Sequence, residues 1–183
     1  MIVHRCFAWN ARGRPDEQDG PLWVPRAFQG DGRHDNADLY GCLYLTDREV
    51  SGVVEQLARF RTQRLQHALL RRRGLPLALA ALDLNDQAEI VDLDDPRVLV
   101  RERLRPSAVA TRRRQVTQSQ ARALHGKHPR AAALRWWSAF EASWVNYTVF
   151  DRAVSALSVV SVRELSLDDE SVIGAADFLG LRR

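Results

Sequence analysis

The stretch from Gly30 to Phe60, GDGRHDNADLYGCLYLTDREVSGVVEQLARF, decides the fold expected for this chain. It opens with a glycine-flanked basic turn around Arg33, and the glycines allow a close approach of the backbone to a ligand. The apolar run from Leu39 to Leu45 then predicts a buried strand. Thr46 as N-cap and Glu49 three residues later predict a capping box that opens an amphipathic helix.

Arg33, Tyr44 and Glu55 fall on the loop, the strand and the helix of this stretch, so they could converge at one end of a sheet. A guanidinium, an aromatic ring and a carboxylate would suit an anionic substrate that contains ribose. The residues alone leave an ordinary alternative open. Glu55 could form an i,i+4 ion pair with Arg59 on a solvated helix face, and the turn could be a plain surface loop.

Outward from this stretch, further apolar runs predict strands and capped periodic runs predict helices. The expected strands are Ile2–Trp9, Leu75–Leu84, Ala88–Leu93, Ala131–Trp137, Trp144–Phe150 and Ala156–Leu165. Expected helices are a continuation over Arg61–Arg73 ending at Gly74, a short one after Asp94-Asp95-Pro96, one over Thr117–His125 with a Thr117–Gln120 capping box and Gly126 as its stop, and Glu170–Leu179.

This order lacks the regular βα alternation of a doubly wound sheet, so it predicts an α+β fold. We expect two packed, mostly antiparallel sheets with flanking helices, in a single domain over residues 1–183.

One residue stands out in the first strand. Arg5 lies within an apolar run, and a buried charge needs a partner. It could face water or pair with a carboxylate at a sheet edge, or it could belong to a site.

Composition narrows the class of protein. The chain has a net charge of +4 and two cysteines, and its pI is about 9.7. Two cysteines make no disulfide framework, and no signal peptide or membrane-spanning run is evident, so we expect a cytoplasmic protein with no membrane partner. The sequence contains no GxxxxGK[ST], GxGxxG, HExxH, CxxC or GxSxG motif, and its five histidines lack metal-ligand spacing, so no metal site is expected.

The ordered set Gly32-Arg33, Leu43-Tyr44, Glu55 and Ser138 resembles the RES domain family, which is named for an arginine, a glutamate and a serine in this order. The resemblance covers roughly Ile2 to Leu165. It extends to the segments HRCF, GDGRHDN, LYGCLYLTDREVSGVVEQL and ALRWWSAFEASWVNYTVFD. Two departures concern the pocket: His34 stands where tryptophan is usual, and Trp137 directly precedes Ser138.

The resemblance implies a toxin of a two-gene toxin–antitoxin pair, usually partnered by a helix-turn-helix (Xre-type) antitoxin, and it is compatible with a homodimer. It also implies a fold similar to ADP-ribosyltransferases. Such proteins destroy NAD by phosphorolysis or hydrolysis of the nicotinamide–ribose bond. NAD would therefore be a substrate rather than a cofactor, and inorganic phosphate would be its co-substrate if the reaction is phosphorolysis.

The chemistry assigns a role to each matched residue. Cleavage of an N-glycosidic bond develops positive charge on the ribose, which the Glu55 carboxylate would stabilise. Arg33, and after it Arg5, would bind the diphosphate or inorganic phosphate. Tyr44 would contact the nicotinamide side, and Ser138 would bind the ribose or orient Glu55. No histidine base for Ser138 is evident, so it is not expected to be a nucleophile.

Two other interpretations stay open. In the first, the runs Arg71–Arg73 and Arg112–Arg114 make the protein a basic module that binds nucleic acid or another partner. Aromatic residues for base stacking are missing beside both runs, so direct binding of nucleic acid is not expected. In the second, the chain keeps a RES-like fold without activity, because His34 and Trp137 alter the pocket.

Overall fold

The computed structural model describes residues 1–182, which form two compact units. Unit 1 holds Met1–Trp23, Leu45–Asp83 and the described residues from Ser158 onward, and unit 2 holds Val24–Tyr44 and Leu84–Leu157. The chain passes from unit 2 to unit 1 within strand β2 (Cys42–Thr46). That residues 1–183 form one domain remains a prediction.

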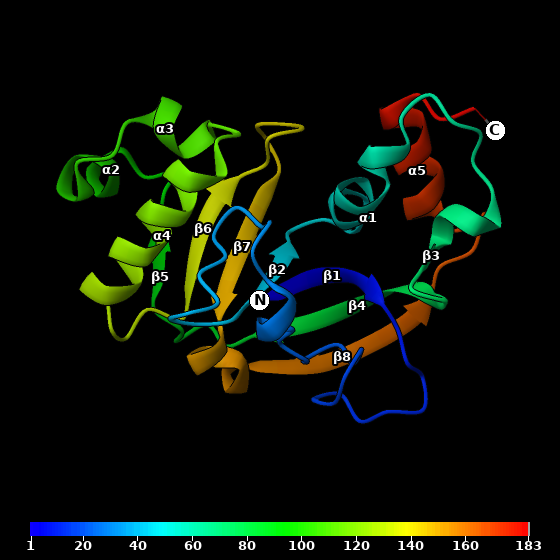
Figure 1. Cartoon of the computed structure of the whole chain (residues 1–183), viewed down its shortest axis with the longest axis horizontal. Helices are drawn as coiled ribbons and strands as arrows, with labels where there is room; N and C mark the ends of the chain where they lie inside the picture. Colours follow the sequence, from blue (N-terminus) through cyan, green and yellow to red (C-terminus); the bar gives the residue numbers. More distant parts are fainter. Residues whose placement is uncertain (183) are drawn as a thin grey trace. The chain divides into compact units, whose positions relative to one another are not determined.

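Unit 1 combines antiparallel strands with two helices (Figure 1). Its elements are β1 (Ile2–Ala8), α1 (Glu49–Leu57), 3-10 turns at Ala58–Phe60 and His67–Leu70, β3 (Arg71–Arg72), β4 (Leu75–Leu84), β8 (Leu157–Glu164) and α5 (Glu170–Leu179). The strand order is β3-β4-β1, and β8 also pairs with β4. β1 and β4 are antiparallel, with Ile2 opposite Asp83 and Ala8 opposite Leu77. α1 packs against both α5 and β1.

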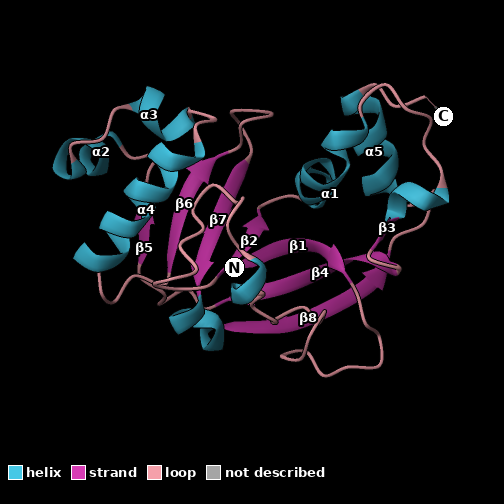
Figure 2. Ribbon diagram, in the orientation of Figure 1, coloured by secondary structure: helices cyan, strands magenta, loops and turns pink. Residues whose placement is uncertain are grey.

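Unit 2 has strand order β2-β7-β6-β5, with helices beside the sheet (Figure 2). Its elements are a 3-10 turn at Arg26–Phe28, the first residues of β2, β5 (Ile90–Asp92), α2 (Pro96–Glu102), α3 (Pro106–Ala110), α4 (Arg114–Lys127), β6 (Ala133–Trp137), β7 (Val145–Phe150) and a 3-10 turn at Asp151–Ala156. β6 is antiparallel to β7 and parallel to β5. Ala121 and Leu124 of α4 share a buried core with Leu134 and Trp136 of β6.

These elements confirm the α+β class with mostly antiparallel strands and flanking helices. The predicted helix over Glu170–Leu179 is observed with those bounds. Its N-cap Asp169 accepts a hydrogen bond from the Ser171 backbone N–H at 2.9 Å, and Gly180 ends it at a φ of 68°. Both signals act within one helical turn, which explains why the sequence suffices to predict them. None of the helices within residues 1–182 is long and apolar enough to cross a membrane.

The predicted capping box of Thr46 and Glu49 is wrong. Thr46 is the last residue of β2, and α1 begins at Glu49 after Arg48, which makes no side-chain cap. The Thr46 hydroxyl instead donates to the Arg48 carbonyl at 2.7 Å. Because Thr46 pairs with His4 of β1, tertiary pairing holds it in extended backbone where the local pattern predicted a helix start.

The helix predicted over Arg61–Arg73 is also wrong. Residues 61–66 contain no helix, and Arg71–Arg72 is a strand that pairs with β4. Arg73 and Gly74 have φ values of 53° and 80°, as in a two-residue hairpin turn of type I′. An arginine run before a glycine resembles a helix C-terminus in sequence, but here the glycine closes a hairpin. Arg73 forms an ion pair with Asp19.

The capping box predicted for Thr117 and Gln120 fails for a tertiary reason. α4 begins at Arg114, so Thr117 lies inside its first turn, and Gly126 lies inside the helix rather than after it. The Thr117 hydroxyl donates to the Arg33 carbonyl at 2.6 Å. A partner 84 residues away along the chain has therefore replaced the local one.

Candidate active site

The turn from Gly30 to Asp35, called the glycine loop below, is organised by one carboxylate. Asp35 Oδ2 accepts from the backbone N–H groups of Gly30 at 2.8 Å and Gly32 at 2.7 Å. A Cβ on Gly32 would collide with the Asp35 carboxylate and the Tyr44 hydroxyl. Gly32 is thus required for space rather than for a positive φ, because no described glycine except Gly74 and Gly180 has one.

Tyr44 of β2 holds this loop through its hydroxyl. The hydroxyl donates to Asp35 Oδ1 at 2.6 Å and accepts from the His34 backbone N–H at 2.9 Å. Burial, with the negative charge of Asp35 nearby, raises the pKa of Tyr44 well above its usual value, so the group stays a neutral donor. The expectation that Tyr44 contacts nicotinamide remains a prediction, and the observed role of its hydroxyl is to order the glycine loop.

Arg33 is buried, with 5% of its surface exposed. Its Nη1 donates to the carbonyl oxygens of Val109 at 2.7 Å and Thr111 at 3.0 Å. The centre of the guanidinium lies 4.7 Å from the centroid of the Trp136 ring, a cation–π contact. These contacts fix the direction of the guanidinium and tie the glycine loop to the connection between α3 and α4.

His34, next to Arg33 in the chain, is buried. Its Nδ1 is 2.8 Å from Thr148 Oγ1, and its ring meets Trp136 edge-on with centroids 5.3 Å apart. Thr148 Oγ1 also accepts from Trp136 Nε1 at 3.1 Å. Burial, followed by the charges of Arg33 and Arg114, lowers the pKa of His34 to about 3. His34 is therefore neutral near pH 7 and acts as a packing residue rather than a cation.

Ser138 follows the last residue of β6. Its backbone N–H donates to the Trp144 carbonyl at 2.8 Å, and its Oγ accepts from the Phe140 N–H at 3.2 Å. The residue is 2% exposed. Within unit 2, the β6–β7 connection that carries Ser138 and the α3–α4 connection that Arg33 contacts lie at the same end of the sheet (Figure 1).

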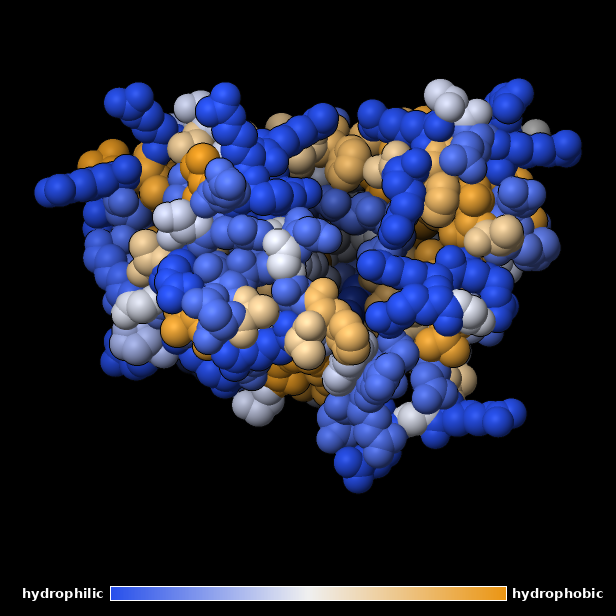
Figure 3. All heavy atoms as spheres, in the orientation of Figure 1, coloured by the Kyte–Doolittle hydropathy of each residue, from blue (hydrophilic) through white to orange (hydrophobic). Residues whose placement is uncertain are grey.

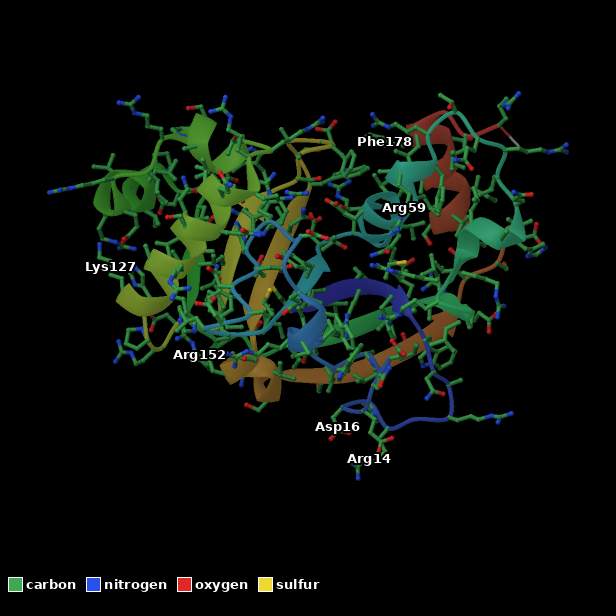
Figure 4. The ribbon with its side chains drawn as sticks, viewed as in Figure 1. Arg14, Asp16, Arg59, Lys127, Arg152 and Phe178 are labelled. Carbon is green, nitrogen blue, oxygen red and sulfur yellow. The ribbon has the colours of Figure 1, made fainter. Side chains whose placement is uncertain are left out.

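Arg5 and Glu55 belong to unit 1. Arg5 is buried in β1 and its Nη1 donates to the carbonyls of Gly20 at 3.1 Å and Pro21 at 2.6 Å. The charge of Arg5 thus anchors the loop whose tip carries Arg14 and Asp16, both labelled in Figure 4.

Glu55 is exposed on α1, next to the fully buried Val53 and Val54 that pack the helix onto unit 1. Arg59, its expected i,i+4 partner, donates from Nε to the Gln56 carbonyl at 3.2 Å. In unit 2, the Tyr44 hydroxyl of β2 contacts the glycine loop that carries Arg33. Ser138 follows β6 at the same end of that sheet as the α3–α4 connection that Arg33 contacts (Figure 1). Arg5 and Glu55 lie in unit 1, and their place in the site remains a prediction.

Three residues of the arrangement were missed from the sequence: Asp35, Thr148 and Thr117. Asp35 had a local signal, because an aspartate after glycines commonly accepts from turn N–H groups. Thr148 and Thr117 had none, since their partners His34 and Arg33 are distant along the chain. Within residues 1–182, no group of three or more His, Cys, Asp or Glu is arranged to hold a metal ion.

The geometry defines a class of α+β proteins. In this class a buried arginine lies on a glycine loop, and a buried serine lies at the end of a neighbouring strand. The RES domain matches residues 4–169, so the chain belongs to the RES domain family. No curated protein matches the chain.

Among solved structures, the chain is similar to one in the crystal structure of the M. tuberculosis MbcT–MbcA toxin–antitoxin complex. The TM-score is 0.60 at 17% sequence identity, and the match covers 99% of this chain and 88% of that one. At this identity the similarity concerns the fold.

Proposed function

We propose that this protein degrades NAD by cleaving the bond between nicotinamide and ribose, as the toxin of a toxin–antitoxin pair. The observation that carries the proposal is the buried Arg33 of the glycine loop, whose guanidinium is held by two carbonyl oxygens and the Trp136 ring in a chain of the RES family. A guanidinium stays positively charged near pH 7, and its planar fork suits the oxygens of an anionic substrate. The toxin role is supported by the fold shared with a protein from a toxin–antitoxin complex.

In the proposed reaction, the C1′–N bond breaks and its electron pair leaves with nicotinamide as a neutral base. The ribose develops oxocarbenium character, which the Glu55 carboxylate would stabilise by Coulomb attraction. An oxygen of inorganic phosphate or of water then bonds to C1′, and water gives up a proton. The products are ADP-ribose 1″-phosphate or ADP-ribose, respectively, together with nicotinamide.

The remaining residues would bind and orient the dinucleotide. Arg33 and Arg5 would bind the diphosphate or inorganic phosphate, and Ser138 would hydrogen-bond the nicotinamide ribose or orient Glu55. Tyr44 would act on the nicotinamide side, both directly and by ordering the glycine loop. No metal or other cofactor enters this scheme.

The proposed setting is the cytoplasm, with a helix-turn-helix antitoxin of Xre type as protein partner and a homodimer as the proposed assembly. An antitoxin would have to cover the substrate site or hold the toxin in an inactive state. Its binding should therefore abolish NAD loss in the same assay that measures the free enzyme.

The test is NAD consumption by purified protein, with and without inorganic phosphate, alongside Glu55→Gln and Arg33→Ala. We expect wild type to release nicotinamide and both variants to lose at least about 100-fold in rate, the scale for removing one preorganised charge from an active site. A phosphate requirement would identify phosphorolysis. Intact NAD under all conditions, with wild-type protein shown to be folded, would leave an inactive RES-like domain as the better description.

A further inference from the structure

A run of three arginines, Arg112–Arg114, joins α3 to α4 and is exposed. Among the described residues, no ion pair involves any of the three. Several other arginines of unit 2 have carboxylate partners, among them Arg97 with Asp95, Arg122 with Asp38, Arg130 with Glu89, and Arg135 with Asp92. The run therefore concentrates positive charge that unit 2 does not neutralise, at an end of the unit where Figure 3 shows hydrophilic side chains projecting over α2, α3 and the start of α4.

Helix electrostatics do not account for the run. It lies at the N-terminal, positive end of α4, and the first turn of that helix contains no acidic residue. Cations at this end destabilise a helix, whereas cations at the opposite end stabilise it. Lys127 occupies that opposite end, where it is labelled in Figure 4, and it is paired with Glu102 at 2.7 Å. The unfavourable placement of the arginines is explained if they bind an anion.

Residues on both sides of the run form hydrogen bonds with the glycine loop. The Arg33 side chain donates to the Thr111 carbonyl, one residue before the run. Thr117 Oγ1 lies 2.6 Å from the Arg33 carbonyl oxygen and 3.2 Å from that of Arg114. Gln118 Nε2 donates to two carbonyls of the glycine loop at 2.9 Å each. Exposed, unpaired arginines are thus held in a fixed relation to the buried Arg33.

We infer that Arg112–Arg114 bind phosphate oxygens for the proposed reaction, either the diphosphate of NAD or inorganic phosphate. The inference rests on the proposed function and deepens it. Two hydrogen bonds direct Arg33 Nη1 at the carbonyl oxygens of Val109 and Thr111, so a second source of phosphate-binding charge would complement it. Guanidinium groups on the adjoining segment supply it, since their planar forks contact phosphate oxygens in pairs. Duplex DNA presents the same oxygens, so it is the competing ligand in the test.

The test compares two triple variants with the same change in charge. R112Q/R113Q/R114Q removes the run, and R101Q/R103Q/R105Q removes three exposed arginines of the same unit that lie outside the run. Calorimetry measures the Kd of ADP-ribose, and NAD turnover measures the KM of NAD and of inorganic phosphate. We expect the first variant to weaken ADP-ribose binding by roughly 10- to 100-fold, as expected for lost charge-assisted hydrogen bonds, and the control to change it less than about threefold.

The results of these measurements distinguish phosphate binding by the run from an effect of net charge and from DNA binding. A raised KM for inorganic phosphate with an unchanged Kd for ADP-ribose supports the inference and identifies the free anion as the ligand. Wild-type kinetics in R112Q/R113Q/R114Q, with wild type cleaving NAD, overturns the inference and leaves the proposed function standing. Equal weakening by both triple variants overturns it in favour of net charge. Wild type that binds duplex DNA with steep salt dependence, but neither cleaves NAD nor binds ADP-ribose, overturns both.

Discussion

The Tyr44 hydroxyl donates a hydrogen bond to the Asp35 carboxylate at 2.6 Å, and this bond joins strand β2 to the glycine loop. Asp35 in turn accepts from two backbone N–H groups of the loop. The Asp35 side chain therefore stabilises the loop through its backbone N–H groups and is itself fixed by Tyr44 of the sheet. This connection orders the position of Arg33, two residues before Asp35.

Removing either partner of that bond should loosen the loop. We expect Tyr44→Phe and Asp35→Asn each to lower the free energy of unfolding by about 1–3 kcal/mol, because each leaves a buried polar group without its partner. In a double-mutant cycle followed by urea unfolding, the double variant should cost about 1 kcal/mol less than the sum of the two single variants. Strict additivity would mean that the two side chains act independently.

Gly32 and Gly30 offer a matched pair of substitutions in one loop. Gly32→Ala should destabilise the protein by about 1–3 kcal/mol, since the added methyl group meets the Asp35 carboxylate and the Tyr44 hydroxyl. Gly30→Ala should stay within about 0.5 kcal/mol, because nothing lies within 4 Å of the new Cβ. Thermal and urea unfolding of both variants measures this difference. Equal effects would contradict the close approach observed at Gly32.

His34 should make the protein less stable in mild acid. The folded state keeps His34 neutral down to a pKa of about 3, whereas the unfolded chain protonates it near the ordinary histidine pKa of 6.5. The unfolded state therefore binds more protons between these values, and stability falls as pH drops through that window, by up to about 1.4 kcal/mol per pH unit. His34→Gln should flatten the stability profile between pH 6.5 and 4, and a profile as steep as that of wild type would contradict this explanation.

Glu102 should contribute stability with a different pH dependence. Burial opposes its ionisation, but hydrogen bonds from Lys127, Arg101 and His128 lower the pKa of Glu102 to about 2. The contribution is complete above the ordinary value of 4.5 and is lost as pH falls through about 2.

We therefore expect Glu102→Gln to cost about 1–3 kcal/mol at pH 6 and clearly less at pH 3, measured by urea unfolding. The Glu102 side chain is only 3% exposed, so solvent screens its ion pairs little. Glu89→Gln is the control, since its ion pair with Arg130 is exposed on both sides and should contribute little at either pH. A Glu102→Gln cost that does not change with pH would contradict the ion-pair explanation.

The sequence was a good guide where a signal acts locally. The helix Glu170–Leu179 was predicted because acidic residues precede it and Gly180 follows it. The short helix after Asp95 was predicted because an aspartate caps its start and a proline occupies its first position. Long apolar strands such as Leu75–Leu84 were equally clear. The ordered arginine, glutamate and serine also led to the RES family, which the match over residues 4–169 confirms.

Where a polar side chain had a choice of partners, only the tertiary structure decided. Thr46 and Thr117 have the sequence pattern of helix caps. Yet the Thr46 hydroxyl donates to the Arg48 carbonyl, and the Thr117 hydroxyl donates to the Arg33 carbonyl. The Arg33 guanidinium binds carbonyls 76 and 78 residues away. Local sequence determines backbone preference within a few residues, but a hydrogen bond goes to whichever group the folded chain brings within about 3 Å, and no local pattern encodes that.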